Sequence, residues 1–215
     1  MNFVAVDYSL NSPGICVYND KSKKYQFISY IKPKTGTKAE QKLQEEIGIL
    51  SDVTLIHQPD FTKEEGYSDG ELAKIKRYDR MADDVINLIL QNSFENDGFI
   101  IAFEGTSYGS KMGTNNMIDM AAGAAILKLK ILKTLKPDDI RTIAPTSLKK
   151  FAGKGNMNKV QLFEAFQTNR IEDKSLLKSP FFAYVAGLDC GTKIPKPLDD
   201  LVDAFFLAAL CASGS

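Results

Sequence analysis

Five carboxylates stand at places along this chain where folding could gather them into one site: Asp7, Glu104, Asp199, Asp200 and Asp203. Asp7 and Glu104 each end an apolar, strand-like run, and the three late aspartates open a nearly all-apolar, helix-like segment. If a sheet brought these ends together, the like charges would raise one another's pKa. Hard divalent cations are bound by oxygen ligands and would remove that penalty. The pattern therefore predicts a carboxylate site for divalent metal ions.

The late aspartates have helical spacing. Asp200 and Asp203 are three residues apart, and Asp199 and Asp203 are four apart, so two or three carboxylates would lie on one side of the first helical turn. An aspartate at a helix start also caps free N–H groups, and this is the more ordinary role for Asp199 alone. A strand-end Asp7 and a surface or capping Glu104 are ordinary too when each is taken alone. The prediction of a site rests on the combination.

The hydrophobic pattern predicts the elements that must position these residues. Three strand-like runs at 3–7, 14–18 and 25–31, separated by short turns, predict an antiparallel meander. Further along, we expect a helix at 72–91, a strand at 99–103, a helix at 115–135, a strand at 139–143 and helices at 145–151 and 158–167. Residues 32–71 lack a clear pattern and are expected to form an insertion at the edge of the core, and 170–196 are poorly patterned as well. This order predicts one mixed α/β domain over residues 1–215.

The composition is that of an ordinary globular domain. Of 215 residues, 44% are hydrophobic, and 27 basic residues balance 27 acidic ones, so no overall positive charge indicates a nucleic-acid partner. Three cysteines without CxxC spacing, and the lack of a leader-like or membrane-spanning apolar stretch, favour a cytoplasmic location with no membrane partner. With His57 as the only histidine, neither a Ser/His/Asp triad nor a histidine-rich zinc site is expected.

Several short motifs, taken in order, give the chain a family resemblance. They are Val6-Asp7-Tyr8-Ser9 with Gly14 following, Ala102-Phe103-Glu104-Gly105, Ala144 to Lys150 followed by Gly153-Lys154-Gly155 and Lys159, and Asp200 with Asp203-Ala204 before an apolar helix. In this order they resemble the RuvC-type Holliday junction resolvases of the ribonuclease H-like superfamily, in a divergent phage- or virus-like branch. The resemblance implies an α/β, ribonuclease H-like fold, with a mixed five-stranded sheet whose first three strands are antiparallel, flanked by helices.

The resemblance also implies an activity and a cofactor. The protein would be a structure-selective endonuclease in which Asp7, Glu104, Asp200 and Asp203 hold two Mg²⁺ ions, which Mn²⁺ could replace. Two such ions activate a water, orient the phosphate and stabilise the leaving oxygen. The doublet at 199–200 leaves Asp199 as an alternative ligand, and Asp200 is preferred because its spacing to Asp203 matches the family.

The implied partner is branched DNA, above all the four-way junction, bound in the cytoplasm of a bacterium or a phage-infected host. A homodimer would suit that substrate, since a junction is nearly two-fold symmetric and needs paired nicks. A local basic patch, here called the lysine patch, would contact DNA phosphates: Lys149, Lys150, Lys154 and Lys159. Tyr108 could stack on a base at the junction or simply cover the core.

Other functions remain open at this point. A ribonuclease H-like nuclease acting on RNA–DNA hybrids or flaps would use the same carboxylates, and a non-catalytic DNA-binding or scaffold protein could keep the fold. Actin-like and sugar-kinase-like ATPases begin with a similar hairpin but need a second domain and glycine-rich nucleotide segments. Gly105–Lys111 lacks the spacing of a phosphate-binding loop, so no nucleotide cofactor is expected.

Overall fold

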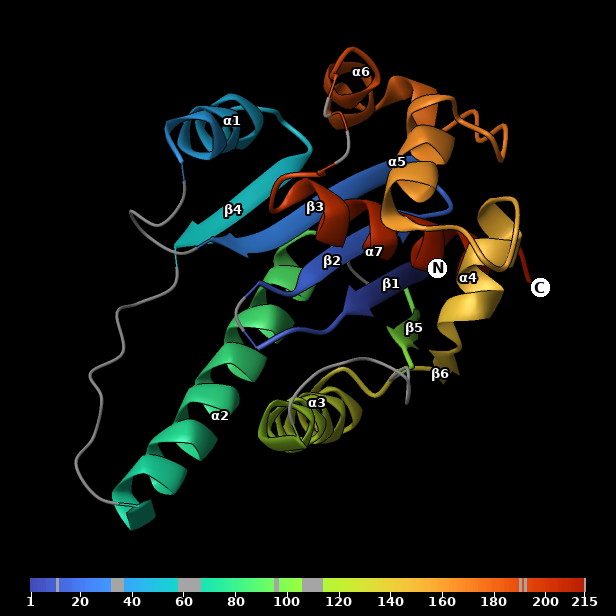
Figure 1. The fold of residues 1–215 in the computed structure, drawn as a ribbon. Helices are drawn as coiled ribbons and strands as arrows, with labels where there is room; N and C mark the ends of the chain where they lie inside the picture. Colours follow the sequence, from blue (N-terminus) through green and yellow to red (C-terminus); the bar gives the residue numbers. More distant parts are fainter. Residues whose placement is uncertain are drawn as a thin grey trace.

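The computed structural model describes residues 1–10, 12–31, 37–57, 67–94, 97–105, 114–189, 191 and 193–214. Within these ranges one mixed sheet has the strand order β4-β3-β2-β1-β5-β6 (Figure 1). The strands are β1 (Asn2–Asp7), β2 (Gly14–Asn19), β3 (Lys24–Ile31), β4 (Val53–His57), β5 (Phe99–Glu104) and β6 (Asp139–Ile143). β1, β2 and β3 form the expected antiparallel meander, whereas β5 runs parallel to β1 and β6 parallel to β5.

The prediction of a five-stranded sheet is wrong, because the segment 32–71 supplies a sixth strand. β4 pairs in parallel with β3 at the edge of the sheet, after helix α1 (Lys38–Gly48). β4 has only five residues, and those after Val53 are partly exposed, so the segment lacks a clear apolar pattern. Buried Asp52 attaches this edge to the rest of the domain, since its carboxylate accepts a hydrogen bond of 3.1 Å from the backbone N–H of Phe181.

Helices cover both faces of the sheet (Figure 1). On one face lie α2 (Tyr67–Gln91) and α3 (Thr114–Thr134), close to the predicted bounds. On the other face lie α1 and the late helices: α4 (Pro145–Ala152), α5 (Lys159–Gln167), α6 (Pro180–Ala186) and α7 (Leu198–Ala212). The short helix α6 falls in the stretch where no pattern was visible, after a 3₁₀ turn at Leu176–Lys178. Across the described ranges, no helix is long and apolar enough to cross a membrane.

Helix α7 crosses the centre of the sheet and brings its acidic first turn to the end of β1 (Figure 1). Nearly all of its apolar residues are buried, and Phe205 and Phe206 pack edge to face against Phe166 of α5. Close approach to β2 requires a glycine: a Cβ at Gly14 would lie 2.2 Å from the carbonyl oxygen of Asp200. The glycine noted in the first motif therefore fixes how closely α7 can approach the sheet.

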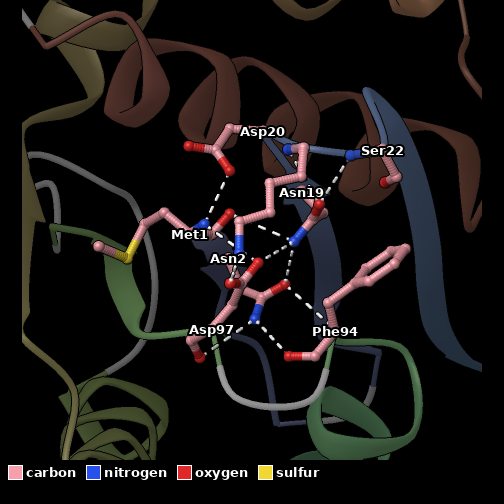
Figure 2. A network of polar contacts seen from close by, with 8 residues as sticks. Met1, Asn2, Asn19, Asp20, Ser22, Phe94 and Asp97 are labelled. Carbon is pink, nitrogen blue, oxygen red and sulfur yellow. Dashed lines mark hydrogen bonds and ion pairs between the residues drawn. The ribbon is translucent and has the colours of Figure 1, made fainter.

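A polar network at the opposite end of the sheet fastens β1 beside β5 (Figure 2). The side chain of Asn2 donates to the carbonyl oxygen of Phe94 (3.2 Å) and accepts from Asn19 (2.8 Å), and both asparagines are buried. Asn19 also donates to the Asp97 carboxylate (3.1 Å), which pairs with the Met1 ammonium (3.2 Å). These bonds tie the start of β1 to the segment before β5, which supports the parallel register that ends with Asp7 beside Glu104.

Candidate active site

The two strand-end carboxylates lie side by side. Asp7 is the last residue of β1 and Glu104 the last of β5, and the parallel register pairs Val6 with Phe103 directly before them. The side chains of Asp7 and Glu104 share a hydrogen bond. This contact lowers the pKa of Asp7 and raises that of Glu104, and burial raises both. The structure therefore brings together the two strand-end carboxylates named in the sequence analysis.

The first turn of α7 brings the remaining three carboxylates to the same place. Asp199 and Asp200 are buried, and Asp203 is partly buried one turn further on. Asp203 interacts electrostatically with Asp7 and with Glu104, and Asp200 interacts with Asp7. We call Asp7, Glu104, Asp199, Asp200 and Asp203 the carboxylate cluster.

Burial and mutual repulsion raise the pKa values in this cluster. Burial, then the charge and hydrogen bond of Asp7, raises the pKa of Glu104 to about 9. Burial, then the charge of Asp7, raises the pKa of Asp203 to about 8, and burial with the charge of Asp199 raises that of Asp200 to about 6. Burial also raises the pKa of Asp7. Near neutral pH the cluster therefore holds protons that ordinary carboxylates would have lost, and an added cation would displace them.

Two lysines pair with the aspartates of α7. The Lys159 ammonium lies 2.7 Å from an oxygen of Asp199, and the Lys196 ammonium lies 3.1 Å from the same carboxylate and also contacts Asp200. Although burial disfavours its charged form, the hydrogen bond to Asp199 and the surrounding carboxylates raise the pKa of Lys159. Lys196 was not among the predicted site residues. It precedes α7, which begins at Leu198, so no helical pattern in the sequence pairs it with Asp199 and Asp200.

The other members of the lysine patch lie near the cluster or on the surface beside it. Lys149 of α4 is partly buried, and its charge lowers the pKa of Glu104 against the larger effects of burial and Asp7. Lys150 and Lys154 are exposed. Lys159 faces Asp199, so the four lysines do not form one uniform surface. Tyr108, the predicted stacking aromatic, lies outside the described residues.

Comparison with solved structures identifies the fold. The Thermus thermophilus RuvC structure matches with a TM-score of 0.52 and 13% identity, over 100% of this chain and 96% of that one. This chain has the fold of RuvC. The T. thermophilus RuvC in complex with a Holliday junction substrate matches with the same TM-score and coverage at 11% identity. The yeast mitochondrial Holliday junction resolvase Ydc2 gives a TM-score of 0.46 at 13% identity, over 99% of this chain and 84% of that one. No family model and no curated protein matches the sequence.

The donor chemistry at the end of this RuvC fold suits a hard divalent ion. The cluster offers carboxylate oxygens alone, the ligands that Mg²⁺ prefers. One of them, Asp199 Oδ1, is buried without a hydrogen-bond partner. As they stand, the described residues contain no group of three or more metal-ligating side chains placed to hold an ion. In this arrangement Glu104 is hydrogen-bonded to Asp7, and lysine ammonium groups contact Asp199 and Asp200. The carboxylate oxygens therefore suit a divalent metal ion, and in this structure two of the carboxylates are paired with lysines.

Proposed function

We propose that this chain is a metal-dependent, structure-selective endodeoxyribonuclease that resolves four-way DNA junctions. The observation that carries the proposal is the convergence of Asp7, Glu104 and the α7 aspartates at one end of a RuvC fold. Buried carboxylates that raise one another's pKa destabilise a fold unless they serve a purpose, and binding divalent ions is the purpose that their chemistry suits.

Each residue has a part in the proposed reaction. Asp7, Glu104, Asp200 and Asp203 would hold two Mg²⁺ or Mn²⁺ ions, with Asp199 as an alternative ligand. When bound, such ions activate water, orient the phosphate and stabilise the leaving oxygen. Asp7 is central to the cluster because it interacts with Glu104 and with the α7 aspartates, so its loss would disturb the whole set of metal-holding carboxylates. Exposed Lys150 and Lys154 would contact phosphates on the flanking DNA.

The substrate class rests on the RuvC comparison and on symmetry. The T. thermophilus RuvC was solved with a Holliday junction substrate, and its fold is shared by this chain. Resolving a junction takes two nicks related by its near two-fold symmetry, so we propose a homodimer with one carboxylate cluster in each subunit. We place it in the cytoplasm of a bacterium or a phage-infected host, as a single domain with an insertion at 32–71.

A cleavage panel tests the proposal. End-labelled four-way junction, flap, linear duplex and RNA–DNA hybrid are incubated with Mg²⁺ and the wild-type protein, Asp7→Asn or Glu164→Gln. Glu164 is an exposed carboxylate of α5, so its variant is the control for loss of one acidic charge. The proposal expects cutting of the junction that Asp7→Asn abolishes and Glu164→Gln retains. Preferential cutting of hybrids or flaps would assign a different substrate to the same site, and tight binding without any cutting would indicate a scaffold.

A further inference from the structure

Lys196 contacts two members of the carboxylate cluster. Its ammonium lies 3.1 Å from Asp199 and contacts Asp200 Oδ1. The other oxygen of Asp200, Oδ2, accepts a hydrogen bond of 3.2 Å from the hydroxyl of Ser12. Both oxygens of Asp200 therefore already have a partner, one of them positively charged.

A divalent ion and this ammonium cannot share Asp200 without strong repulsion. Two positive charges on one carboxylate would lie within a few ångströms of each other, where charges repel strongly in a partly buried site. Asp200 is held in place, with a side chain only 5% exposed, whereas that of Lys196 is 51% exposed. The mobile partner is thus the lysine, whose flexible four-carbon stem can turn toward solvent.

We propose that Lys196 is an internal counter-cation that competes with the divalent metal for Asp200 and transfers to a DNA phosphate when substrate binds. Without DNA, the lysine satisfies Asp200 and weakens metal binding. A nearby phosphate offers the ammonium another anionic partner, which frees Asp200 for the metal. Lys196 is thereby a positioning residue that couples metal loading to substrate. The inference rests on the proposed metal-dependent nuclease function.

Lys159 does not share this role. Its ammonium lies 2.7 Å from Asp199, whereas Lys196 bridges Asp199 and Asp200. Removing Lys196 is therefore the change that exposes Asp200 to a metal ion. Lys193 provides a matched control, because it is an exposed lysine three residues earlier in the same segment.

The test measures Mn²⁺ binding without DNA, by titration calorimetry, for the wild type and for Lys196→Gln, Lys196→Arg, Lys193→Gln and Asp7→Asn. We expect Lys196→Gln to bind Mn²⁺ about three- to tenfold more tightly than the wild type, since it removes a weak, half-exposed ion pair. Lys196→Arg, which keeps the charge, and Lys193→Gln should both bind as the wild type does. In EDTA, Lys196→Gln should also bind the junction less tightly, with the slope of log K against log salt reduced by about 0.9.

The outcomes separate this inference from the proposed function. If Asp7→Asn weakens Mn²⁺ binding but Lys196→Gln leaves it unchanged or weaker, the metal site stands and the competition is refuted. If Lys196→Gln leaves the slope of log K against log salt unchanged for junction binding in EDTA, the transfer of the lysine to a DNA phosphate is refuted. If Asp7→Asn does not alter Mn²⁺ binding, the metal site and the inference fall together. Circular dichroism spectra that match the wild type establish that each variant is folded.

Discussion

Replacing Asp7 by asparagine should stabilise the metal-free protein while removing its activity. The shape of the side chain is retained, and an asparagine can still exchange a hydrogen bond with Glu104. What disappears is a buried negative charge. That charge is the largest cause, after burial, of the raised pKa values of Glu104 and Asp203.

The sign of the effect follows from proton linkage. Glu104 and Asp203 have pKa values of about 9 and about 8 in the folded protein, above their ordinary values of 4.5 and 3.8. Between those limits the folded state binds protons that the unfolded state has lost, so stability falls as pH rises through this window. Removing the Asp7 charge lowers both folded pKa values and therefore relieves part of that loss at pH 8. At pH 4 both carboxyls are protonated in the folded state with or without the Asp7 charge, so the benefit disappears.

The magnitude can be worked from the same values. One pKa unit corresponds to about 1.4 kcal/mol only at a pH well above the folded pKa. At pH 8 Glu104 is still mostly protonated and Asp203 is half ionised, so a decrease of roughly one unit at each is on the order of 1.5 kcal/mol. Both side chains are partly exposed, and solvent screening reduces this to about 1 kcal/mol. For a domain of this size, about 2–4 °C of melting temperature accompanies each kcal/mol, which gives an increase of about 2–4 °C.

The assay is thermal unfolding in EDTA at pH 8 and at pH 4, for the wild type, Asp7→Asn and the exposed-site control Glu164→Gln. Only Asp7→Asn should melt at a higher temperature at pH 8, and its advantage should vanish at pH 4. A melting temperature at pH 8 equal to or below that of the wild type would refute the account of a mutually repelling, metal-ready cluster.

Three further predictions follow from the site. In EDTA, the wild-type melting temperature should fall between pH 5 and pH 9, because the carboxyls with raised pKa values ionise over this range. Added Mg²⁺ should restore the melting temperature more at pH 8 than at pH 5. An equal effect of Mg²⁺ at both pH values would count against the cluster as the metal site. Gly14→Ala should lower the free energy of unfolding by about 1–3 kcal/mol and remove most of the activity, because its Cβ would lie 2.2 Å from the Asp200 carbonyl oxygen. The control Gly70→Ala has open space around it in α2 and should not destabilise the protein. Denaturant unfolding measures both variants, and an unchanged stability of Gly14→Ala would refute the argument that α7 needs this close approach. The double variant Lys150→Gln/Lys154→Gln should weaken junction binding and reduce the salt slope by about 1.8 if both residues contact phosphate, and an unchanged slope in a salt titration would exclude them.

The parts of the fold that were predictable have strong local signals. Asp7 and Glu104 could be singled out from sequence because each ends an unbroken apolar run, and the parallel register of β1 and β5 then places these two ends together. Helix α2 was also predictable, because Tyr78, Val85 and Ile89 recur at helical spacing, and in the structure all three are buried. Ile75, in the same stripe, is 53% exposed, since the first part of α2 buries fewer of its apolar residues.

What the sequence could not reveal depends on contacts made after folding. β4 gains its place from pairing with β3 and from Asp52, whose buried carboxylate bonds to α6, and neither contact leaves a periodic pattern. Lys159 was predicted only as a DNA-contacting lysine and Lys196 was not predicted at all, because their pairing with Asp199 and Asp200 exists only in the folded chain. The buried environment of the aspartates, and not the identity of the lysines, creates that pairing.

The most direct test of the central claim is single-turnover cleavage of an end-labelled four-way junction with every nick mapped, with Mg²⁺ and with EDTA, for the wild type and Asp7→Asn. The account predicts paired, symmetric nicks by the wild type with Mg²⁺, none in EDTA, and a rate for Asp7→Asn at least about 100-fold lower. Nicking that persists in EDTA, or that Asp7→Asn performs at the wild-type rate, would contradict a carboxylate-held metal site as the source of the chemistry.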